Sequence, residues 1–268
     1  MLKRVIFNRK GGVGKSTITC NLACIAANKG KKVLVIDLDP QANSTSYLGH
    51  DGKDDVVGIA EYLESTITRN YRKLNADDFI RKTDYDNLFL ISASGSLTDI
   101  ESKLEAKHKI YKLRSFLESF NDRFDEVYID TPPALNFYTL SALIAADRCL
   151  IPFDCSAFAR DAMFDLVYEL EEIIEDHNPE LYIEGVVVNQ FVTRANLPKQ
   201  AVAELQEAGF NVLEPYLSSS VKVKESHALN RPMIYLEPRH KVSEQFIELY
   251  KKLNRKKRSS AKKITSGD

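Results

Sequence analysis

The chain has 268 residues, of which 44% are hydrophobic and 28% are charged, a composition typical of one large globular domain or at most two small ones. No apolar run approaches the ~18 residues that a membrane-spanning helix needs, and the N-terminus leads straight into a strand-like run, so neither a transmembrane nor a secreted protein is expected. The net charge of -1 excludes a uniformly basic or acidic protein, but the last eighteen residues carry eight lysines and arginines against one aspartate.

Predicted strands and helices alternate along the chain. Residues 5–7 form a short apolar strand, and residues 16–29 have apolar positions at helical spacing, with Gly30 as the C-cap. The continuous β-branched run at 33–36 is expected for a strand buried on both faces of a parallel sheet. Further strands are predicted at 88–91, 127–130, 148–152, 182–188 and 211–216, and helices at 97–120, 136–146, 157–177, 197–208 and 239–254.

This alternation predicts an α/β fold with a doubly wound, mostly parallel sheet flanked by helices. No internal repeat or linker divides the chain, so residues 1–254 are expected to form one domain. The polar segment 50–86 is expected to hold short helices over one edge of the sheet. The basic residues 255–268 are expected to be a disordered tail.

A glycine-rich turn separates the first strand from the first helix. It reads Lys-Gly-Gly-Val-Gly-Lys-Ser-Thr over residues 10–17. Glycines let the backbone turn tightly and point successive N–H groups at phosphate oxygens, and the following helix adds its positive N-terminal end. A lysine and a hydroxyl at the helix start supply a phosphate ligand and a Mg²⁺ ligand. The predicted nucleotide-binding residues of this loop are Lys10, Gly11, Gly12, Val13, Gly14, Lys15, Ser16 and Thr17.

The loop departs from the ordinary P-loop pattern, because Arg9 stands where that pattern needs glycine and a second lysine, Lys10, precedes Lys15 by five residues. In this it resembles the deviant Walker A loop of the ParA/MinD group of ATPases, which also includes the nitrogenase iron protein and the arsenite-pump ATPases. The resemblance implies that Lys10 reaches across an ATP-dependent homodimer to phosphates bound by the partner. A cation supplied in trans offsets charge on the transferring phosphoryl group, as an arginine finger does.

Carboxylates follow two of the predicted strands. Asp37-Leu38-Asp39-Pro40-Gln41-Ala42-Asn43 and Asp130-Thr131-Pro132-Pro133 both resemble segments of the same group. Carboxylates at the carboxyl edge of a parallel sheet lie beside the phosphate loop. By resemblance, Asp37 supports the Mg²⁺ region, Asp39 orients the attacking water, and Asp130 holds Mg²⁺ through a water. Any one aspartate alone is equally well explained as a cap or turn residue.

The resemblance covers roughly residues 3–250. Asn189, at the end of the run 186–188, resembles the group's adenine-contacting asparagine, and Pro215 begins a segment that resembles its late nucleotide-binding loop. Leu217-Ser218-Ser219 stands where Pro-Arg is common in the group, so the usual arginine cannot be carried over.

The sequence also bears on which branch of the group applies. Residues 130–148 lack the cysteines of a nitrogenase-type cluster, and none of Cys20, Cys24, Cys149 and Cys155 forms a CxxC pair. The end of the chain lacks the apolar face of a membrane-binding amphipathic helix, so no membrane partner is expected. The chain begins at its first strand, so an N-terminal helix-turn-helix extension is not expected.

A short ParA-type partition or positioning ATPase remains, cytoplasmic and associated with the nucleoid. The resemblance implies hydrolysis stimulated by a ParB-like or adaptor protein and non-specific DNA binding, which needs lysines and arginines facing phosphates rather than base readout. The alternatives are a MinD-like positioning ATPase that uses the basic tail on anionic lipids and a metabolic ligase of the dethiobiotin synthetase kind. The candidate DNA contacts, besides the basic tail and Lys199, are Arg194, Lys222, Lys224, Arg231, Arg239 and Lys241.

Overall fold

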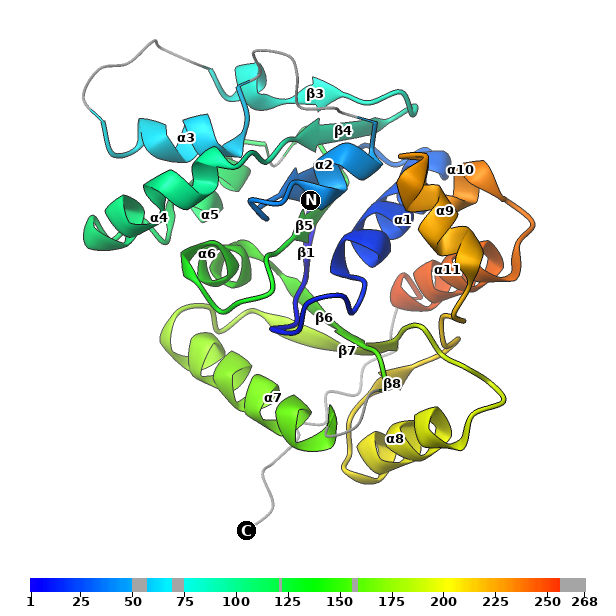
Figure 1. Cartoon of the computed structure of the whole chain (residues 1–268). Helices are drawn as coiled ribbons and strands as arrows, with labels where there is room; N and C mark the ends of the chain where they lie inside the picture. Colours follow the sequence, from blue (N-terminus) through cyan, green and yellow to red (C-terminus); the bar gives the residue numbers. More distant parts are fainter. Residues whose placement is uncertain (50–56, 69–74, 121, 156–158, 256–268) are drawn as a thin grey trace.

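The computed structural model describes residues 1–49, 57–68, 75–120, 122–155 and 159–255. The strands of this part of the chain form one twisted sheet (Figure 1). They are β1 (Leu2–Ile6), β2 (Val33–Asp37), β3 (Arg81–Lys82), β4 (Leu88–Ile91), β5 (Glu126–Asp130), β6 (Arg148–Phe153), β7 (Tyr182–Val188) and β8 (Val212–Leu213). Their order across the sheet is β3-β4-β2-β5-β1-β6-β7-β8.

The sheet is parallel except at one edge, where β3 runs antiparallel to β4. This confirms the doubly wound α/β class predicted from the sequence. The strand order reverses around β1, with β5 and β2 on one side and β6 and β7 on the other. Ligands of open α/β sheets bind at such a switch point, outside the carboxyl ends of the strands. The phosphate loop follows β1 at this place.

Helices cover both faces of the sheet. Alternate residues of each strand face opposite cores: Leu34 and Ile36 of β2 pack on one side, and Val35 packs on the other. The helices are α1 (Lys15–Asn28), α2 (Asn43–Tyr47), α3 (Ile59–Ser65), η1 (Ala76–Phe79), α4 (Ser96–Ala106), α5 (Lys112–Glu118), α6 (Phe137–Ala145), α7 (Ala159–Asp176), α8 (Asn196–Glu207), α9 (Val221–Ala228), α10 (Met233–Leu236) and α11 (Lys241–Leu253). The core on the Val35 side includes residues of α1, α2, α10 and α11, whereas the other core includes residues of α3 to α8.

The single helix predicted at 97–120 is wrong, because α4 ends at Ala106 and α5 begins at Lys112. His108 adopts the left-handed conformation, and the Lys109 amide donates back to Leu104 O, which closes the end of α4. The break turns α5 so that Phe116 stacks on Tyr62 of α3. Charged residues with good helix propensity cross this break, so tertiary packing overrides local preference here.

Other predicted elements differ mainly in length. The last strand, predicted at 211–216, is limited to Val212–Leu213. The segment 50–86 contains α3 and η1 as expected, but it also contributes the short edge strand β3, which its polar sequence did not indicate. Residues 50–56 and 69–74 of this segment lie outside the described residues, as does the predicted tail from residue 256 onward.

A buried ion pair joins the middle of β1 to β7. The fully buried Arg4 donates from Nε and Nη2 to the two carboxylate oxygens of Glu184 on β7, at 2.6 and 3.1 Å. The second carboxylate, Glu126 on β5, accepts hydrogen bonds from the hydroxyls of Tyr128 and Tyr250, at 2.8 and 2.9 Å. Two carboxylates, a guanidinium and two hydroxyls thus satisfy one another inside the core, as buried charges require.

Candidate active site

The phosphate loop connects β1 to α1 through two glycines in the left-handed region. Gly12 has a φ of 75° and Gly14, which caps the N-terminus of α1, has a φ of 94°. A side chain at Gly14 would overlap the amide of Asn189. The glycine pattern therefore has a steric cause here, because both the backbone conformation and the close approach of the Asn189 side chain, just past β7, oppose a Cβ at this position.

Two polar side chains at the end of β7 hold this loop. Asn189 Nδ2 donates to Val13 O and Gln190 Nε2 donates to Gly12 O, each at 2.8 Å. The segment after β8 lies alongside, since the Leu217 amide donates to Val188 O at 2.8 Å. Asn189 and the segment that begins with Pro215 are therefore brought together beside the loop. Their predicted contact with adenine stays a prediction.

Lys15 is buried beneath the loop, with 6% of its surface exposed. Its Nζ donates to the main-chain oxygens of Asn8 and Lys10, each at 3.0 Å. Burial lowers the pKa of Lys15, while the nearby Asp130 and Asp39 oppose that shift. The Lys15 amino group is thus held by neutral carbonyl oxygens of the loop itself. An anionic acceptor such as a phosphate oxygen would displace them.

Lys10 and its neighbour Arg9 are tied to the chain that follows β6. Lys10 Nζ lies 2.6 Å from Asp154 Oδ2, and about half of the Lys10 side chain is exposed (49%). Arg9 Nη1 lies 2.6 Å from Glu169 Oε1 on α7. The two basic residues that distinguish this loop from the ordinary pattern therefore both form ion pairs on the same side of it. Neither Asp154 nor Glu169 was singled out from the sequence.

Asp37 and Asp130 are paired positions at the carboxyl ends of β2 and β5. Asp37 Oδ2 accepts from the Thr45 amide and hydroxyl, both at 2.8 Å, and Asp37 Oδ1 accepts from the Asp39 amide at 3.0 Å. Asp130 Oδ2 accepts from the Ser44 hydroxyl at 2.7 Å. The carboxylates predicted from the strand ends are therefore brought together beside the loop.

Burial raises the pKa of Asp37 to about 8, with the charge of Asp130 adding to the shift. Burial also raises the pKa of Asp130 to about 6, although hydrogen bonds from Ser16 and Ser44 lower it. Two adjacent buried carboxyls favour sharing a proton or binding a cation. A hydroxyl, carboxylates and waters are the oxygen ligands that Mg²⁺ prefers, so the donor set fits this ion.

Asp39 lies on the turn after β2 and is nearly buried, with 6% of its surface exposed. Its Oδ1 accepts from the Gln41 amide at 2.9 Å, and its main-chain oxygen accepts from the Ala42 amide at 2.8 Å. These bonds fix the carboxylate at the start of the segment that leads into α2. Its predicted role with water stays a prediction, as do the catalytic, nucleotide and metal roles of the other site residues.

Within the described ranges, no group of three or more His, Cys, Asp and Glu side chains is arranged to hold a metal ion. A Mg²⁺ site here would therefore need Ser16, water and phosphate oxygens in addition to the carboxylates. All four cysteines are buried and carry free thiols.

A further cluster beside the loop escaped the sequence analysis. Thr17 Oγ1 lies 2.7 Å from Nε2 of His227 on α9, and the His227 ring stacks on Tyr47 of α2. A single histidine far along the chain gives no spacing signal, so only the fold reveals this contact.

The candidate DNA-binding residues fall in two places. Arg194 is exposed on the connection between β7 and α8, and the remaining five lie between residues 222 and 241, around α9, α10 and the start of α11. Lys222 Nζ pairs with Glu225 Oε2 at 2.8 Å and lies 3.5 Å from Glu237 Oε1. Lys224, Arg231, Arg239 and Lys241 are exposed.

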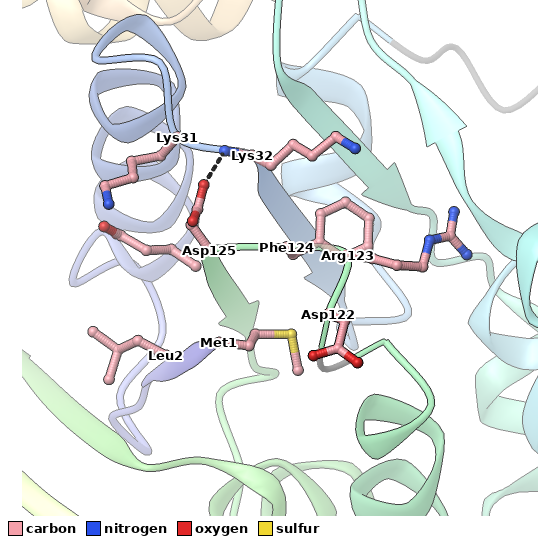
Figure 2. Close-up of a pocket in the computed structure, with 9 residues that line it drawn as sticks. Met1, Leu2, Lys31, Lys32, Asp122, Arg123, Phe124 and Asp125 are labelled. Atoms are coloured by element: carbon pink, nitrogen blue, oxygen red, sulfur yellow. Dashed lines mark hydrogen bonds between the residues drawn. The ribbon is translucent and has the colours of Figure 1, made fainter.

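A cavity of about 500 Å³ lies at the opposite end of the sheet (Figure 2). Its lining includes Leu2, Lys32 and Glu126, which stand at or just before the starts of β1, β2 and β5. Asp125, in the same lining, accepts a hydrogen bond from the Lys32 amide at 2.8 Å. Because the phosphate loop and both buried aspartates lie at the carboxyl ends of these strands, this cavity is separate from the candidate site.

Among the described residues, no helix has the length and apolarity needed to cross a membrane.

Residues 3–183 match the family model described as an AAA domain. The chain is 31% identical over 252 residues to the sporulation initiation inhibitor protein Soj of Bacillus subtilis, covering 92% of this chain and 96% of that protein. It is 32% identical over 253 residues to the chromosome partitioning protein ParA of Myxococcus xanthus, covering 92% and 86%. A Cyanothece McdA variant solved in complex with ATP has the same fold, with a TM-score of 0.81, 23% identity, and coverage of 94% of this chain and 96% of that chain.

Proposed function

Because this chain belongs to the AAA domain family and is homologous to the ParA and Soj partition ATPases, we propose that it is an ATPase that dimerises on binding ATP, binds DNA non-specifically and partitions or positions a cargo. The cargo is a plasmid, a chromosome or a large protein assembly, and a ParB-like or adaptor protein stimulates hydrolysis. The observation that carries the proposal is that the phosphate loop holds two lysines in different environments. Lys15 is buried, whereas the additional lysine, Lys10, is half-exposed.

The loop binds the triphosphate. Its backbone amides and the N-terminal end of α1 attract phosphate oxygens. Lys15 Nζ moves from the oxygens of Asn8 and Lys10 to the β- and γ-phosphates, because an ammonium group is attracted more strongly to an anionic phosphate oxygen than to a neutral carbonyl oxygen. Asn189 and Pro215 contact the adenine, which is supported by the bond of Asn189 to the loop and by the bond of Leu217, two residues after Pro215, to the end of β7.

Ser16, Asp37 and Asp130 form the Mg²⁺ region. Bound there, Mg²⁺ neutralises charge on the phosphate oxygens. Ser16 and Ser44 both donate to Asp130, and Thr45 donates twice to Asp37, so the carboxylates are held in place before ATP arrives. Asp39 orients the attacking water. Catalysis rests mainly on positioning and charge.

Lys10 acts across the dimer. Its ammonium leaves Asp154 and approaches the triphosphate bound by the partner, so that ATP becomes part of the interface between two copies. The lysines and arginines of α9 to α11 then face DNA, which makes the protein associate with the nucleoid. Exposed positive charge on these elements supports this assignment.

The test compares Lys10→Ala with the wild type in ATP, ADP and no nucleotide. The variant is expected still to bind ATP, to lose at least about 100-fold in hydrolysis and to remain a monomer, because the trans cation is missing. Nucleotide titration, phosphate release and light scattering measure the three properties. Lys3→Ala removes a lysine from another Lys–Asp pair, with Asp147, and serves as the matched control.

Wild-type hydrolysis and dimer formation by Lys10→Ala would contradict a role of Lys10 at the triphosphate of the partner. Co-sedimentation of the wild type with DNA and, separately, with anionic liposomes tests the partner. ATP-dependent binding to liposomes but not to DNA would favour the MinD-like alternative. Hydrolysis that required a small acceptor molecule would favour the ligase.

A further inference from the structure

One residue of α9 contacts two parts of the candidate nucleotide site. His227 Nε2 lies 2.7 Å from Thr17 Oγ1, at the start of α1. The His227 ring stacks on the ring of Tyr47, at the end of α2, with centroids 3.9 Å apart and planes 16° apart. Thr17 directly follows Ser16, and α2 directly follows the segment that contains Asp39. The two partners of His227 thus belong to the phosphate loop and to the segment that carries the water-orienting aspartate.

The neighbouring residue, Ser226, also connects α9 to Tyr47 of α2. The fully buried Ser226 shares a hydrogen bond of 2.8 Å between its hydroxyl and that of Tyr47. Asn21 of α1 donates to the same tyrosine oxygen at 3.4 Å. Residues 226 and 227 therefore attach α9 to α1 and α2 through a small polar cluster beside the phosphate loop.

His227 suits a positional role rather than a charged one. Burial lowers the pKa of His227, which favours the neutral ring. A neutral imidazole has one donor and one acceptor nitrogen, so it forms a directional bond with a hydroxyl in either tautomer. The hydrogen bond and the stack together fix both the position and the plane of the ring.

The outer part of α9 carries basic side chains. Lys224 is exposed, and Lys222 lies beside Glu225 and Glu237. A shift of α9 relative to α1 would move these ammonium groups and would change the Lys222–Glu237 contact, which joins α9 to the chain after α10. His227, near the C-terminal end of this short helix, is therefore placed so that the position of α9 can depend on the nucleotide site.

We propose that His227 is a positioning residue that couples the phosphate loop and α2 to α9, so that ATP fixes the position of α9 and of its lysines. The consequence of this coupling, ATP-dependent binding of a polyanion, rests on the proposed function. The two are separable, because the position of α9 can be followed without DNA. Such a coupling is a free energy shared between two sites, and it acts in both directions.

The experiment is amide hydrogen exchange of residues 221–228, with and without a non-hydrolysable ATP analogue. In the wild type the analogue is expected to slow exchange in α9 about fivefold, a factor within the range of one net hydrogen bond. His227→Phe keeps a ring on Tyr47 but cannot bond Thr17, so it should lose this protection while still binding the analogue. His227→Gln keeps an amide that can bond Thr17 and should restore at least half of the protection.

The matched control is His177→Phe, because His177, directly after α7, forms a similar bond of 2.9 Å between its Nδ1 and the hydroxyl of Tyr111, the N-cap of α5. This variant should keep the full protection of α9. Protection that persists in His227→Phe, or that is missing from the wild type, would overturn the coupling. If His227→Phe does not fold, Thr17→Val deletes the other partner of the bond, and it is measured at analogue concentrations shown by titration to saturate it, because Thr17 belongs to the predicted nucleotide-binding loop. Retained protection of α9 in the saturated variant would equally overturn the coupling.

DNA binding is measured on the same proteins. His227→Phe is expected to lose about fivefold of the ATP-dependent gain in DNA affinity and to keep its nucleotide-free affinity. Wild-type protection of α9 without any DNA binding would refute the proposed function and leave the coupling in place. ATP-dependent DNA binding with no effect of His227→Phe on either measurement would refute the coupling alone.

Discussion

The phosphate loop and the surface formed by α9 to α11 both carry lysines, but the two regions constrain them differently. Lys15 is buried and bonded to two main-chain oxygens, whereas Lys224 is exposed on a short helix. In the loop, backbone conformation, burial and neighbouring carboxylates each require one residue type. On the surface, any basic side chain supplies nearly the same charge. Sequence motifs are therefore informative where geometry limits the choice, and they are weak where only charge matters.

Lys15→Ala is expected to give the largest effect, because it removes two charge-assisted bonds to the triphosphate. A loss of about 3 kcal/mol in binding, or roughly 100-fold in affinity, is expected. Titration with ATP and Mg²⁺ measures it, and circular dichroism checks that the variant is folded. Unchanged ATP affinity would show that the loop is not the binding site, and the contrast between the two regions would fail with it.

Gly14→Ala is expected to have an intermediate effect, since its φ of 94° and the amide of Asn189 both oppose a Cβ. Gly30→Ala is the matched control, because Gly30 also has a positive φ, of 79°, but a Cβ there meets nothing within 4 Å. The control should cost about 1 kcal/mol of unfolding free energy and leave ATP binding unchanged. Gly14→Ala should cost more and should weaken ATP binding about tenfold. Urea denaturation and nucleotide titration distinguish them, and equal results for both would mean that Asn189 yields freely.

Lys224→Ala is expected to have a smaller effect than either substitution in the loop, because one exposed cation among several contributes little. DNA affinity should fall about two- to threefold, and the slope of its salt dependence should decrease by about 1. Lys222→Ala should change both less, since Glu225 and Glu237 already balance that charge. Fluorescence anisotropy over a salt series measures this. A tenfold loss at either lysine would show that this surface is as constrained as the loop.

The fold and the position of the candidate site could largely be predicted because strand ends carry their own signal. Continuous apolar runs ending in Asp37 and Asp130 predicted parallel strands with carboxylates at the carboxyl edge of the sheet, and the glycine turn predicted the phosphate loop beside them. The adjacency of the two strands and the switch point at β1 emerge only from the structure. The contacts of His227 with Thr17 and Tyr47 could not be predicted, because they join residues 210 and 180 positions apart. The break after Ala106 escaped prediction because no glycine or proline marks it and the residues across it have good helix propensity.

The ion pair of Arg4 with Glu184 has a consequence at the carboxyl end of β1, where the phosphate loop begins. Only five residues separate Arg4 from Lys10, so the pairing that seats the guanidinium also sets how far the chain extends before it turns. Sliding β1 by one residue would move the turn by about 3.3 Å and point Arg4 to the opposite face, leaving two acids inside without a cation. The buried pair thus fixes the register of β1 in the sheet, and so keeps the phosphate loop beside Asp37 and Asp130.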